Sequence, residues 1–318
     1  MNTNSSHKDR PVFAISVSVG GLGVSCVQDV ILKMMSGQYP LWQFAVVRSI
    51  TAVIGISLIL VLLKQSSQLR PNRPGLIAVR GFLTFVGYTC FYLSLASLPL
   101  ADAISIFFVA PLLVTLLSIP FLGEKVRLRR WTALLVGFAG VIVMVRPGAG
   151  GVQPMLLLAL GAPVCYAASL IITRRIGFAD TGATMVLYNM VIFGISSAIG
   201  SLILSWLSLP TAEHASLAFL IRPWELPSTT HLGLMIATGV VTAIAHFCSA
   251  IAYRSAPPSL VAVFEYTYFI WALLLGYIFW REIPSVQTFV GAGIVMLSGA
   301  YVVHRETQLA RAARVLKQ

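Results

Sequence analysis

Residues 80–124 read RGFLTFVGYTCFYLSLASLPLADAISIFFVAPLLVTLLSIPFLGE, and residues 238–282 read TGVVTAIAHFCSAIAYRSAPPSLVAVFEYTYFIWALLLGYIFWRE. When the first stretch is shifted by 158 positions, matched residue types recur along the whole of both stretches. The matches are Gly81 and Gly239, Thr84 and Thr242, Cys90 and Cys248, Ser97 and Ser255, Pro99 and Pro257, Leu116 and Leu274, Leu117 and Leu275, Phe121 and Phe279, and Glu124 and Glu282. The chain therefore carries a duplicated apolar unit, which is the usual ground plan of a secondary transporter.

The composition indicates that this chain is embedded in a lipid bilayer. Hydrophobic residues make up 58% of the 318 residues and charged residues only 10%, whereas a soluble domain has about 25% charged residues. The mean hydropathy is +0.88. The net charge of +12 does not indicate a nucleic-acid partner, because the basic residues lie almost wholly between apolar runs, where they set membrane topology. The expected partners are membrane lipid and a small-molecule substrate.

Ten apolar runs are long enough to cross a bilayer, since about 20 helical residues span about 30 Å of hydrocarbon. They lie at 12–35, 41–63, 75–97, 100–122, 128–146, 153–174, 183–207, 231–253, 257–280 and 284–304. The longest connection, residues 208–230, is rich in Pro, Ser, Thr and Glu. The sequence therefore predicts an all-α integral membrane protein with ten transmembrane helices.

The positions of Lys and Arg predict that both termini lie in the cytoplasm. With the N-terminus inside, 17 of the 22 basic residues fall on the inner side, and only Arg146, Arg222 and Arg281 fall on the outer side. The remaining two, Lys33 and Arg48, lie within spans. Such a bias toward the inner side is the rule for membrane proteins. We expect the bacterial inner membrane as the location, and a monomer or a homodimer.

Five spans per half is an odd number, so the two halves must have opposite orientations. The sequence thus predicts two inverted five-helix repeats, at residues 1–147 and 153–304, followed by a cytoplasmic basic tail at residues 305–318. The loop after the fourth span is strongly basic, whereas its counterpart after the ninth span has lost most of that charge. This difference agrees with an inner and an outer position for the two loops.

The region from residue 92 to residue 148 resembles the EamA branch of the drug/metabolite transporter superfamily. The resemblance is carried by Pro99 between spans three and four, Pro111 within span four, the Gly123-Glu124 pair that ends it, and Gly137 and Gly140 in span five. It extends over nearly the whole chain as two halves. It implies ten helices in inverted repeats and alternating access around a central cavity. Across this family the substrates include amino acids, nucleotide-like molecules, vitamins such as riboflavin, polyamines and drugs.

The second half matches this pattern less well. Arg281 stands where the Gly of the Gly-Glu pair is expected, and Phe269 stands opposite Pro111. Glu265 also breaks the duplication, because its counterpart is Phe107. Glu265 lies about 12 Å into the ninth span, near the bilayer midplane. A charge at that depth is costly, so we expect Glu265 to contact a substrate amine or to couple transport to protons, with a structural acid as the alternative.

Three further charged residues lie within the first two spans. Asp29 and Arg48 should reach similar depths on adjacent antiparallel helices, and Lys33 follows Asp29 by one helical turn. One interpretation is a structural ion pair between Asp29 and either Arg48 or Lys33. The other is that Arg48 anchors a carboxylate or another anionic group of the substrate.

One histidine and several aromatic residues complete the candidate cavity. His246 is either a packing residue or a residue that senses a proton gradient, because imidazole titrates near neutral pH. An aromatic lining suits stacking on a planar ring or holding an organic cation, which favours a flavin or an aromatic amino acid over a sugar. The aromatic candidates for substrate contact are Tyr88, Tyr92, Phe107, Phe108, Tyr266 and Trp271.

The leading function is secondary active transport of a small organic metabolite, namely a planar or aromatic solute such as riboflavin, or an amino acid. A membrane receptor or scaffold and a membrane enzyme are the alternatives. No Walker loop, nucleophile elbow, HExxH or CxxC motif occurs, so we expect no enzyme, no catalytic residue, no cofactor and no metal. The four cysteines lie inside apolar runs, where they pack as small hydrophobic side chains; they are Cys26, Cys90, Cys165 and Cys248.

Overall fold

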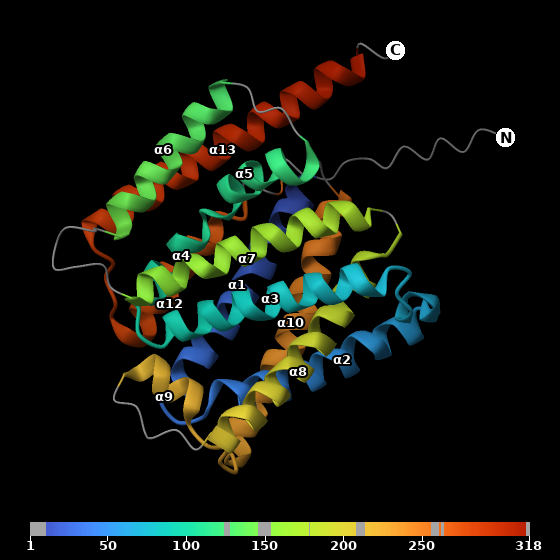
Figure 1. Ribbon diagram of the computed structural model, residues 1–318, viewed down its shortest axis with the longest axis vertical. Helices are drawn as coiled ribbons and strands as arrows, with labels where there is room; N and C mark the ends of the chain where they lie inside the picture. The colour runs from blue at the N-terminus through green and yellow to red at the C-terminus, as the bar shows by residue number, and fades with distance from the viewer. Residues whose placement is uncertain are drawn as a thin grey trace.

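The computed structural model describes residues 11–123, 128–145, 154–177, 179–207, 214–255, 261 and 264–315, and these residues form helices and connections without any strand (Figure 1). The helices of the first half are α1 (Pro11–Met35), α2 (Leu41–Leu62), η1 (Ser66–Leu69), α3 (Pro74–Leu95), α4 (Leu100–Phe107), α5 (Ala110–Leu122) and α6 (Leu128–Val145). Those of the second half are α7 (Pro154–Ile176), α8 (Gly182–Leu207), α9 (Ala215–Ile221), α10 (Thr229–Ser255), α12 (Thr267–Trp280) and α13 (Val286–Val315).

Seven helical segments of the described chain are long and apolar enough to cross a membrane, which makes this an integral membrane protein. They overlap the first four predicted spans and the sixth, seventh and eighth. Three shorter apolar helices, at Trp131–Met144, Thr267–Trp280 and Val286–Tyr301, lie within the fifth, ninth and tenth predicted ranges. Helix α13 continues past residue 304, so the predicted basic tail is helical up to Val315.

The helices are arranged with their polar side chains inward, as a bilayer requires. On α2 the buried face includes Arg48 and Ser49, whereas Ile50, Ile54 and Leu58 on the opposite face are more than half exposed. Placing an isoleucine or leucine side chain in lipid is favourable, whereas placing an arginine there costs free energy. The sequence of α2 thus determines which face packs against the other helices.

The fourth predicted span is interrupted, and a proline explains the interruption. Helix α4 ends at Phe107 and α5 begins at Ala110, with i to i−3 hydrogen bonds at Phe108 and Val109 between them. Pro111 lacks the N–H that would bond to the carbonyl of Phe107, and its ring disfavours helical geometry in the preceding residue. The chain restarts as a new helix with Pro111 in its first turn.

The ninth span is interrupted at the corresponding place. Residues Glu265 and Tyr266 form a turn, and α12 begins at Thr267. No proline stands opposite Pro111 here, so the interruption has no comparable signal in the sequence. The two interruptions touch each other, because α4 packs on α12 and the rings of Phe108 and Tyr266 make an edge contact with centroids 5.2 Å apart.

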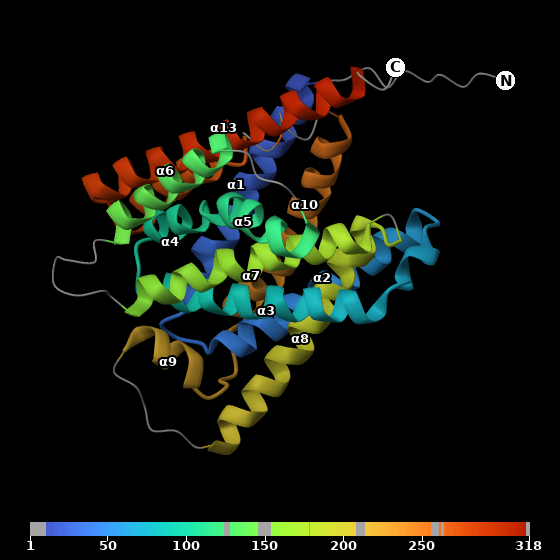
Figure 2. The same ribbon diagram turned by 45° about the horizontal axis from the view of Figure 1, so that its top comes forward.

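Small residues allow the closest helix contacts. Helix α1 packs on α10, where a Cβ at Gly21 would lie 2.6 Å from Cβ of Cys248. Helix α3 packs on α7, where a Cβ at Gly161 would lie 3.2 Å from Sγ of Cys90. Cys90 and Cys248 are matched positions of the duplicated stretches, so the two contacts correspond. Figure 2 shows a third close pair, α6 beside α13 along one edge.

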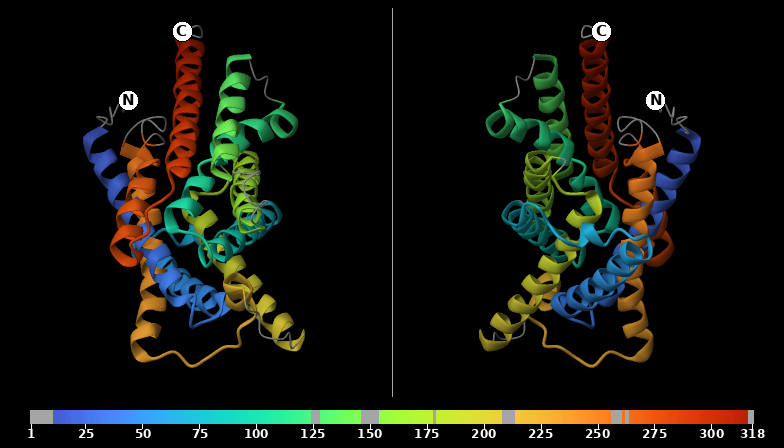
Figure 3. Two further views of the ribbon diagram at one scale, coloured as in Figure 1. Left: turned by 90° about the vertical axis from the view of Figure 1, so that its left-hand side faces the viewer. Right: turned by 90° about the vertical axis from the view of Figure 1, so that its right-hand side faces the viewer.

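The long connection predicted at residues 208–230 contains the short helix α9, which the sequence did not predict. Ser216 of α9 donates a 2.6 Å hydrogen bond to the carbonyl of Leu93 and lies 2.6 Å from the hydroxyl of Ser97. We call this side of the molecule, where α1 ends and α9 lies, the α9 end. Helix α1 begins and α13 ends on the opposite side, at the top of Figure 3.

Candidate functional site

A chain of hydrogen bonds joins four helices through buried side chains. Arg48 of α2 donates through Nη1 to the hydroxyl of Tyr92 of α3. Gln28 of α1 donates to the same hydroxyl at 3.2 Å, and its carbonyl oxygen accepts from Thr242 of α10 at 2.5 Å. Each of these four residues is less than 9% exposed. Buried polar groups of this kind specify one arrangement of the helices, because an unmade bond in an apolar interior is costly.

Arg48 sits among aromatic rings. Its guanidinium carbon lies 5.5 Å from the ring centroid of Tyr88, 5.6 Å from that of Tyr92 and 5.4 Å from that of Phe193. The side chain is only 1% exposed, and its buried Nε has no hydrogen-bond partner among the described residues. Aromatic faces stabilise the cation, but they accept no hydrogen bond in the plane of the guanidinium. The site therefore holds a positive charge with donor capacity to spare.

Asp29 and Lys33 do not form the ion pairs that their spacing suggested. Asp29 is 4% exposed and accepts a 2.6 Å hydrogen bond from the hydroxyl of Tyr268 of α12. Lys33 instead pairs with Glu282, 2.5 Å from its Oε1. Among the described residues, no ion pair joins Asp29 to Arg48 or to Lys33. The partner of Asp29 comes from α12, and the partner of Lys33 comes from the segment that follows α12, both distant in sequence.

Glu265 lies at the interruption before α12, and its side chain is exposed. Its carboxylate lies within electrostatic range of the hydroxyls of Tyr166 and Tyr266. The Tyr166 ring packs on Phe107 with centroids 5.1 Å apart, and Phe107 packs on Phe91 at 6.1 Å. Phe91 in turn contacts Tyr92 at 5.6 Å. We call Tyr92, Phe91, Phe107 and Tyr166 the aromatic row; it leads from Arg48 toward the neighbourhood of Glu265.

The other predicted residues divide between this site and its surroundings. Tyr88 stacks on Tyr92 with centroids 5.6 Å apart and belongs to the Arg48 site. His246 bonds through Nδ1 to the carbonyl of Thr242 within its own helix, one turn from the hydrogen-bonded chain. Phe108 and Tyr266 form the contact between the two helix interruptions. Trp271 donates to the carbonyl of Val19 at 3.0 Å and packs on α1.

Sequence reasoning missed several residues that complete the site. Gln28 stands next to Asp29 in an apolar span, and Thr242 is matched with Thr84 in the duplication, so both carried a weak signal. Tyr166 and Phe193 lie in α7 and α8, where nothing in the sequence separates them from lipid-facing aromatic residues. Tyr268 could be found only through its contact with Asp29. Glu124, which ends the fourth predicted span, lies outside the described residues.

The first half of the chain matches a known family, and most of the chain matches proteins named as transporters. Residues 14–146 match the EamA-like transporter family. The chain is 27% identical to the riboflavin transporter of Vibrio cholerae over 95% of this chain and 96% of that protein. It is 24% identical to the S-adenosylmethionine uptake transporter of Rickettsia conorii, over 89% of each chain. It is also 24% identical to the pseudopaline exporter CntI of Pseudomonas aeruginosa PAO1, over 86% of this chain and 89% of that protein.

A solved crystal structure of a protein aligns with 94% of this chain and 98% of its own, with a TM-score of 0.58 and 20% identity, which supports the fold alone. The apolar helices and the relatives named as transporters define the class, an integral membrane transporter of small molecules. Within this class, the EamA-like match of the first half and the relatives named as transporters support membership of the drug/metabolite transporter superfamily.

Proposed function

We propose that the protein is a secondary active transporter that moves a small organic metabolite across the bacterial inner membrane by alternating access. Its two halves, residues 1–147 and 153–304, are inverted five-helix repeats. Their relative movement opens the central site to one side of the membrane while closing it to the other. Both termini, including the tail at 305–318, are cytoplasmic. The basic inner loops support this orientation, as does the position of the first and last helices at one end of the molecule.

The helix contacts support the two-repeat arrangement. Exchanging the halves maps α1 onto α7, α2 onto α8, and α3 onto α10. Two of the closest contacts then have counterparts: α3 with α7 corresponds to α10 with α1, and α3 with α8 corresponds to α10 with α2. The contacts of α2 with α8 and of α6 with α13 map onto themselves. Such a pattern is what a two-fold relation between the halves would produce.

The observation that carries the proposal is the meeting of the two interrupted helices. The α4–α5 interruption and the one before α12 occupy matched positions and touch through Phe108 and Tyr266. Discontinuous helices near the midplane form the substrate sites of many transporters, because their backbone groups are released from helical hydrogen bonds. A receptor or a scaffold does not require such paired interruptions.

The side chains of the candidate site suggest the substrate class. Arg48 supplies a positive charge and an unused donor, the aromatic row supplies stacking faces, and Glu265 supplies an exposed carboxylate. We assign the site to a planar or aromatic solute that carries a hydrogen-bond acceptor or an anionic group at one end. Riboflavin, after which the Vibrio cholerae relative is named, is the first solute to test, followed by amino acids.

Glu265 is the proposed coupling residue. It is the acid that distinguishes the second interruption from the first, where Phe107 stands. A carboxyl that gains and loses a proton beside the substrate can couple solute movement to a proton gradient. The alternative functions are a membrane receptor or scaffold and a membrane enzyme. The relatives named as transporters do not favour either of them.

The proposal is tested first by binding. Purified protein is heated with riboflavin, amino acids, nucleosides or polyamines, and a ligand present at 100 times its Kd should stabilise the folded state by about 2.7 kcal/mol. The Glu265→Gln variant should fold normally, and should lose concentrative or pH-dependent transport of the ligand so found. Unchanged accumulation and an unchanged pH profile in Glu265→Gln would leave Glu265 as a structural acid.

A further inference from the structure

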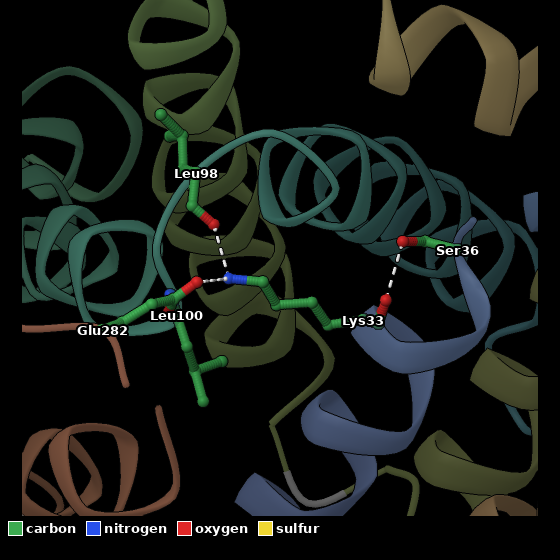
Figure 4. A network of polar contacts seen from close by, with 5 residues as sticks. All are labelled: Lys33, Ser36, Leu98, Leu100 and Glu282. Carbon is green, nitrogen blue, oxygen red and sulfur yellow. Dashed lines mark hydrogen bonds and ion pairs between the residues drawn. The ribbon is translucent and has the colours of Figure 1, made fainter. Parts of the chain in front are cut away.

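Lys33 and Glu282 bring together three segments that are distant in sequence. The ammonium of Lys33, near the end of α1, lies 2.5 Å from Oε1 of Glu282, which follows α12 (Figure 4). The same ammonium donates to the carbonyl of Leu98 at 2.9 Å. The other carboxylate oxygen of Glu282 accepts from the backbone N–H of Leu100 at 2.9 Å. The pair therefore holds both sides of the connection between α3 and α4.

Several features stabilise this cluster. Oε2 of Glu282 faces the N-terminus of α4, where a carboxylate satisfies a free N–H and meets the positive end of the helix. The ammonium of Lys33 lies 4.9 Å from the ring centroid of Trp280. The side chains are 10% and 22% exposed, so solvent screens their attraction less than it screens a surface pair. Removal of one partner would leave the other charge partly buried and uncompensated.

The rest of the α9 end is joined by hydrogen bonds of other kinds. Arg222 donates to the carbonyl of Ser36 at 3.0 Å, and the hydroxyl of Tyr39 lies 2.9 Å from Nδ1 of His231. Gln43 bonds to the backbone of Glu225 in both directions, at 2.7 and 3.2 Å. Lys33–Glu282, by contrast, is an ion pair.

The opposite end has a different arrangement. Asp180 accepts from the backbone N–H groups of Asn72 and Arg73 at 2.6 and 3.1 Å, and Arg73 donates to the carbonyl of Arg175 at 2.9 Å. These bonds join the loop before α3 to the loop after α7, two segments that already pack through their helices. At the α9 end, by contrast, the ion pair joins α1 and the segment after α12 to the α3–α4 connection.

We propose that the Lys33–Glu282 pair is a latch that holds the α9 end closed, and that the latch must break before solute can pass at that end. This inference rests on the proposed transport function. Opening separates α1 and the segment after α12 from the α3–α4 connection, so it breaks the two hydrogen bonds by which Lys33 holds Leu98 and Glu282 holds Leu100. The ion pair keeps both side chains in the positions that these two bonds require. The latch sets the ratio of closed to open forms and does not contact the substrate.

The test uses the native thiol Cys26 as a reporter. Cys26 is fully buried and lies two turns before Lys33 on α1, about 10 Å deeper into the membrane. Cys90, Cys165 and Cys248 are replaced by Ala, and a membrane-impermeant maleimide is added from the side that the α9 end faces. Glu282→Gln and Lys33→Gln should raise the rate of Cys26 labelling about tenfold or more, because they shift the population toward the open form.

Two variants serve as controls. Glu225→Gln makes the same chemical change at the same end, at a residue that bonds Gln43 through its backbone, and should leave the labelling rate unchanged. The Lys33→Arg variant keeps the charge, so its α9 end should stay closed and Cys26 should be labelled at the wild-type rate. The exchange of Lys33→Glu with Glu282→Lys restores the attraction but loses the bonds to Leu98 and Leu100, so its labelling rate should fall between the wild type and Glu282→Gln.

The latch is refuted if folded Glu282→Gln protein labels at the wild-type rate, or if Glu225→Gln accelerates labelling equally. If a single variant does not fold, the double variant Lys33→Met and Glu282→Gln removes both charges of the pair and must show the same acceleration. Labelling requires no solute. An unchanged labelling rate would therefore contradict the latch without contradicting transport. Accelerated labelling in a protein that shows no solute flux would contradict transport but support the latch.

Discussion

Tyr268 donates a hydrogen bond of 2.6 Å to Oδ2 of Asp29 and thereby joins the first turn of α12 to α1. Asp29 is 4% exposed, and no ion pair neutralises it among the described residues. The carboxyl group thus depends on one hydroxyl from a helix that is more than 200 positions away in the sequence. This contact lies between the interruption before α12 and the Lys33–Glu282 latch.

Replacing Tyr268 by Phe should destabilise the protein more than replacing Asp29 by Asn. Tyr268→Phe leaves a buried acceptor unsatisfied, at a cost of about 1–3 kcal/mol. Asp29→Asn removes the charge but keeps a carbonyl oxygen that can accept from Tyr268. The measurement is the Tm in detergent for both variants. Equal Tm values for Tyr268→Phe and the wild type would show that the hydrogen bond contributes nothing to stability.

Arg48→Lys should fail to replace arginine even though it keeps the charge. A lysine cannot place a planar cation against Tyr88, Tyr92 and Phe193 at once, so about 1–2 kcal/mol of stabilisation should be lost. We expect a folded protein that binds the ligand with a roughly tenfold higher Kd, as determined from the thermal assay at several ligand concentrations. A ligand response equal to that of the wild type would place Arg48 outside the substrate site.

The combined variant Asp29→Asn with Arg48→Leu distinguishes a structural pair from separate roles. Since Asp29 bonds to Tyr268 and Arg48 to Tyr92, the second substitution should not repair the damage of Arg48→Leu. Transport by the double variant should stay as low as that of Arg48→Leu alone. Recovery of transport in the double variant would restore the structural-pair interpretation that the sequence had left open.

Adjacent glycines of α1 offer a matched test of the α1–α10 contact. A Cβ at Gly21 would lie 2.6 Å from Cβ of Cys248, whereas a Cβ at Gly20 would meet nothing within 4 Å. Gly21→Ala should therefore cost about 1–3 kcal/mol, since forced overpacking shifts the backbone. Gly20→Ala should be neutral or slightly stabilising, because Ala favours a helix by about 1 kcal/mol over Gly. Equal Tm values for the two variants would contradict the close packing of α1 on α10.

The positions of most helices could be predicted from the sequence, because crossing a bilayer demands long apolar runs. The interruption at Pro111 also had a local cause that a sequence displays. The interruption at Glu265 and Tyr266 did not, since no proline stands there and tertiary contacts such as Phe108 with Tyr266 determine it. The short helix α9 was hidden for a similar reason, because its seven residues are held by Ser97 and Leu93 of another segment.

The candidate site was predicted in part. Charged residues inside apolar spans stand out individually, so Asp29, Lys33, Arg48 and Glu265 were found. Their partners were not, because Tyr268 lies in α12 and Glu282 follows it, and the position of this segment beside α1 is a property of the fold. Aromatic residues were too frequent for the sequence to separate the members of the aromatic row from those that face lipid.

The topology can be checked independently of any substrate. Reporter fusions after residues 150 and 318 should report the outer and the inner side respectively, because the first half contains five predicted spans and the whole chain ten. A fusion after residue 64 should again report the inner side. Fusions at 150 and 318 that report the same side would contradict the inverted repeat.

The central claim is alternating access to a site formed around Arg48, and the most direct test is solute exchange in proteoliposomes. Vesicles that contain the purified protein are loaded with the unlabelled form of the solute found in the thermal screen, and uptake of the labelled solute is followed. We predict that the internal solute accelerates uptake, and that Arg48→Lys reduces the accelerated rate about tenfold or more. A solute that binds the wild-type protein but enters its vesicles no faster than protein-free liposomes would contradict transport.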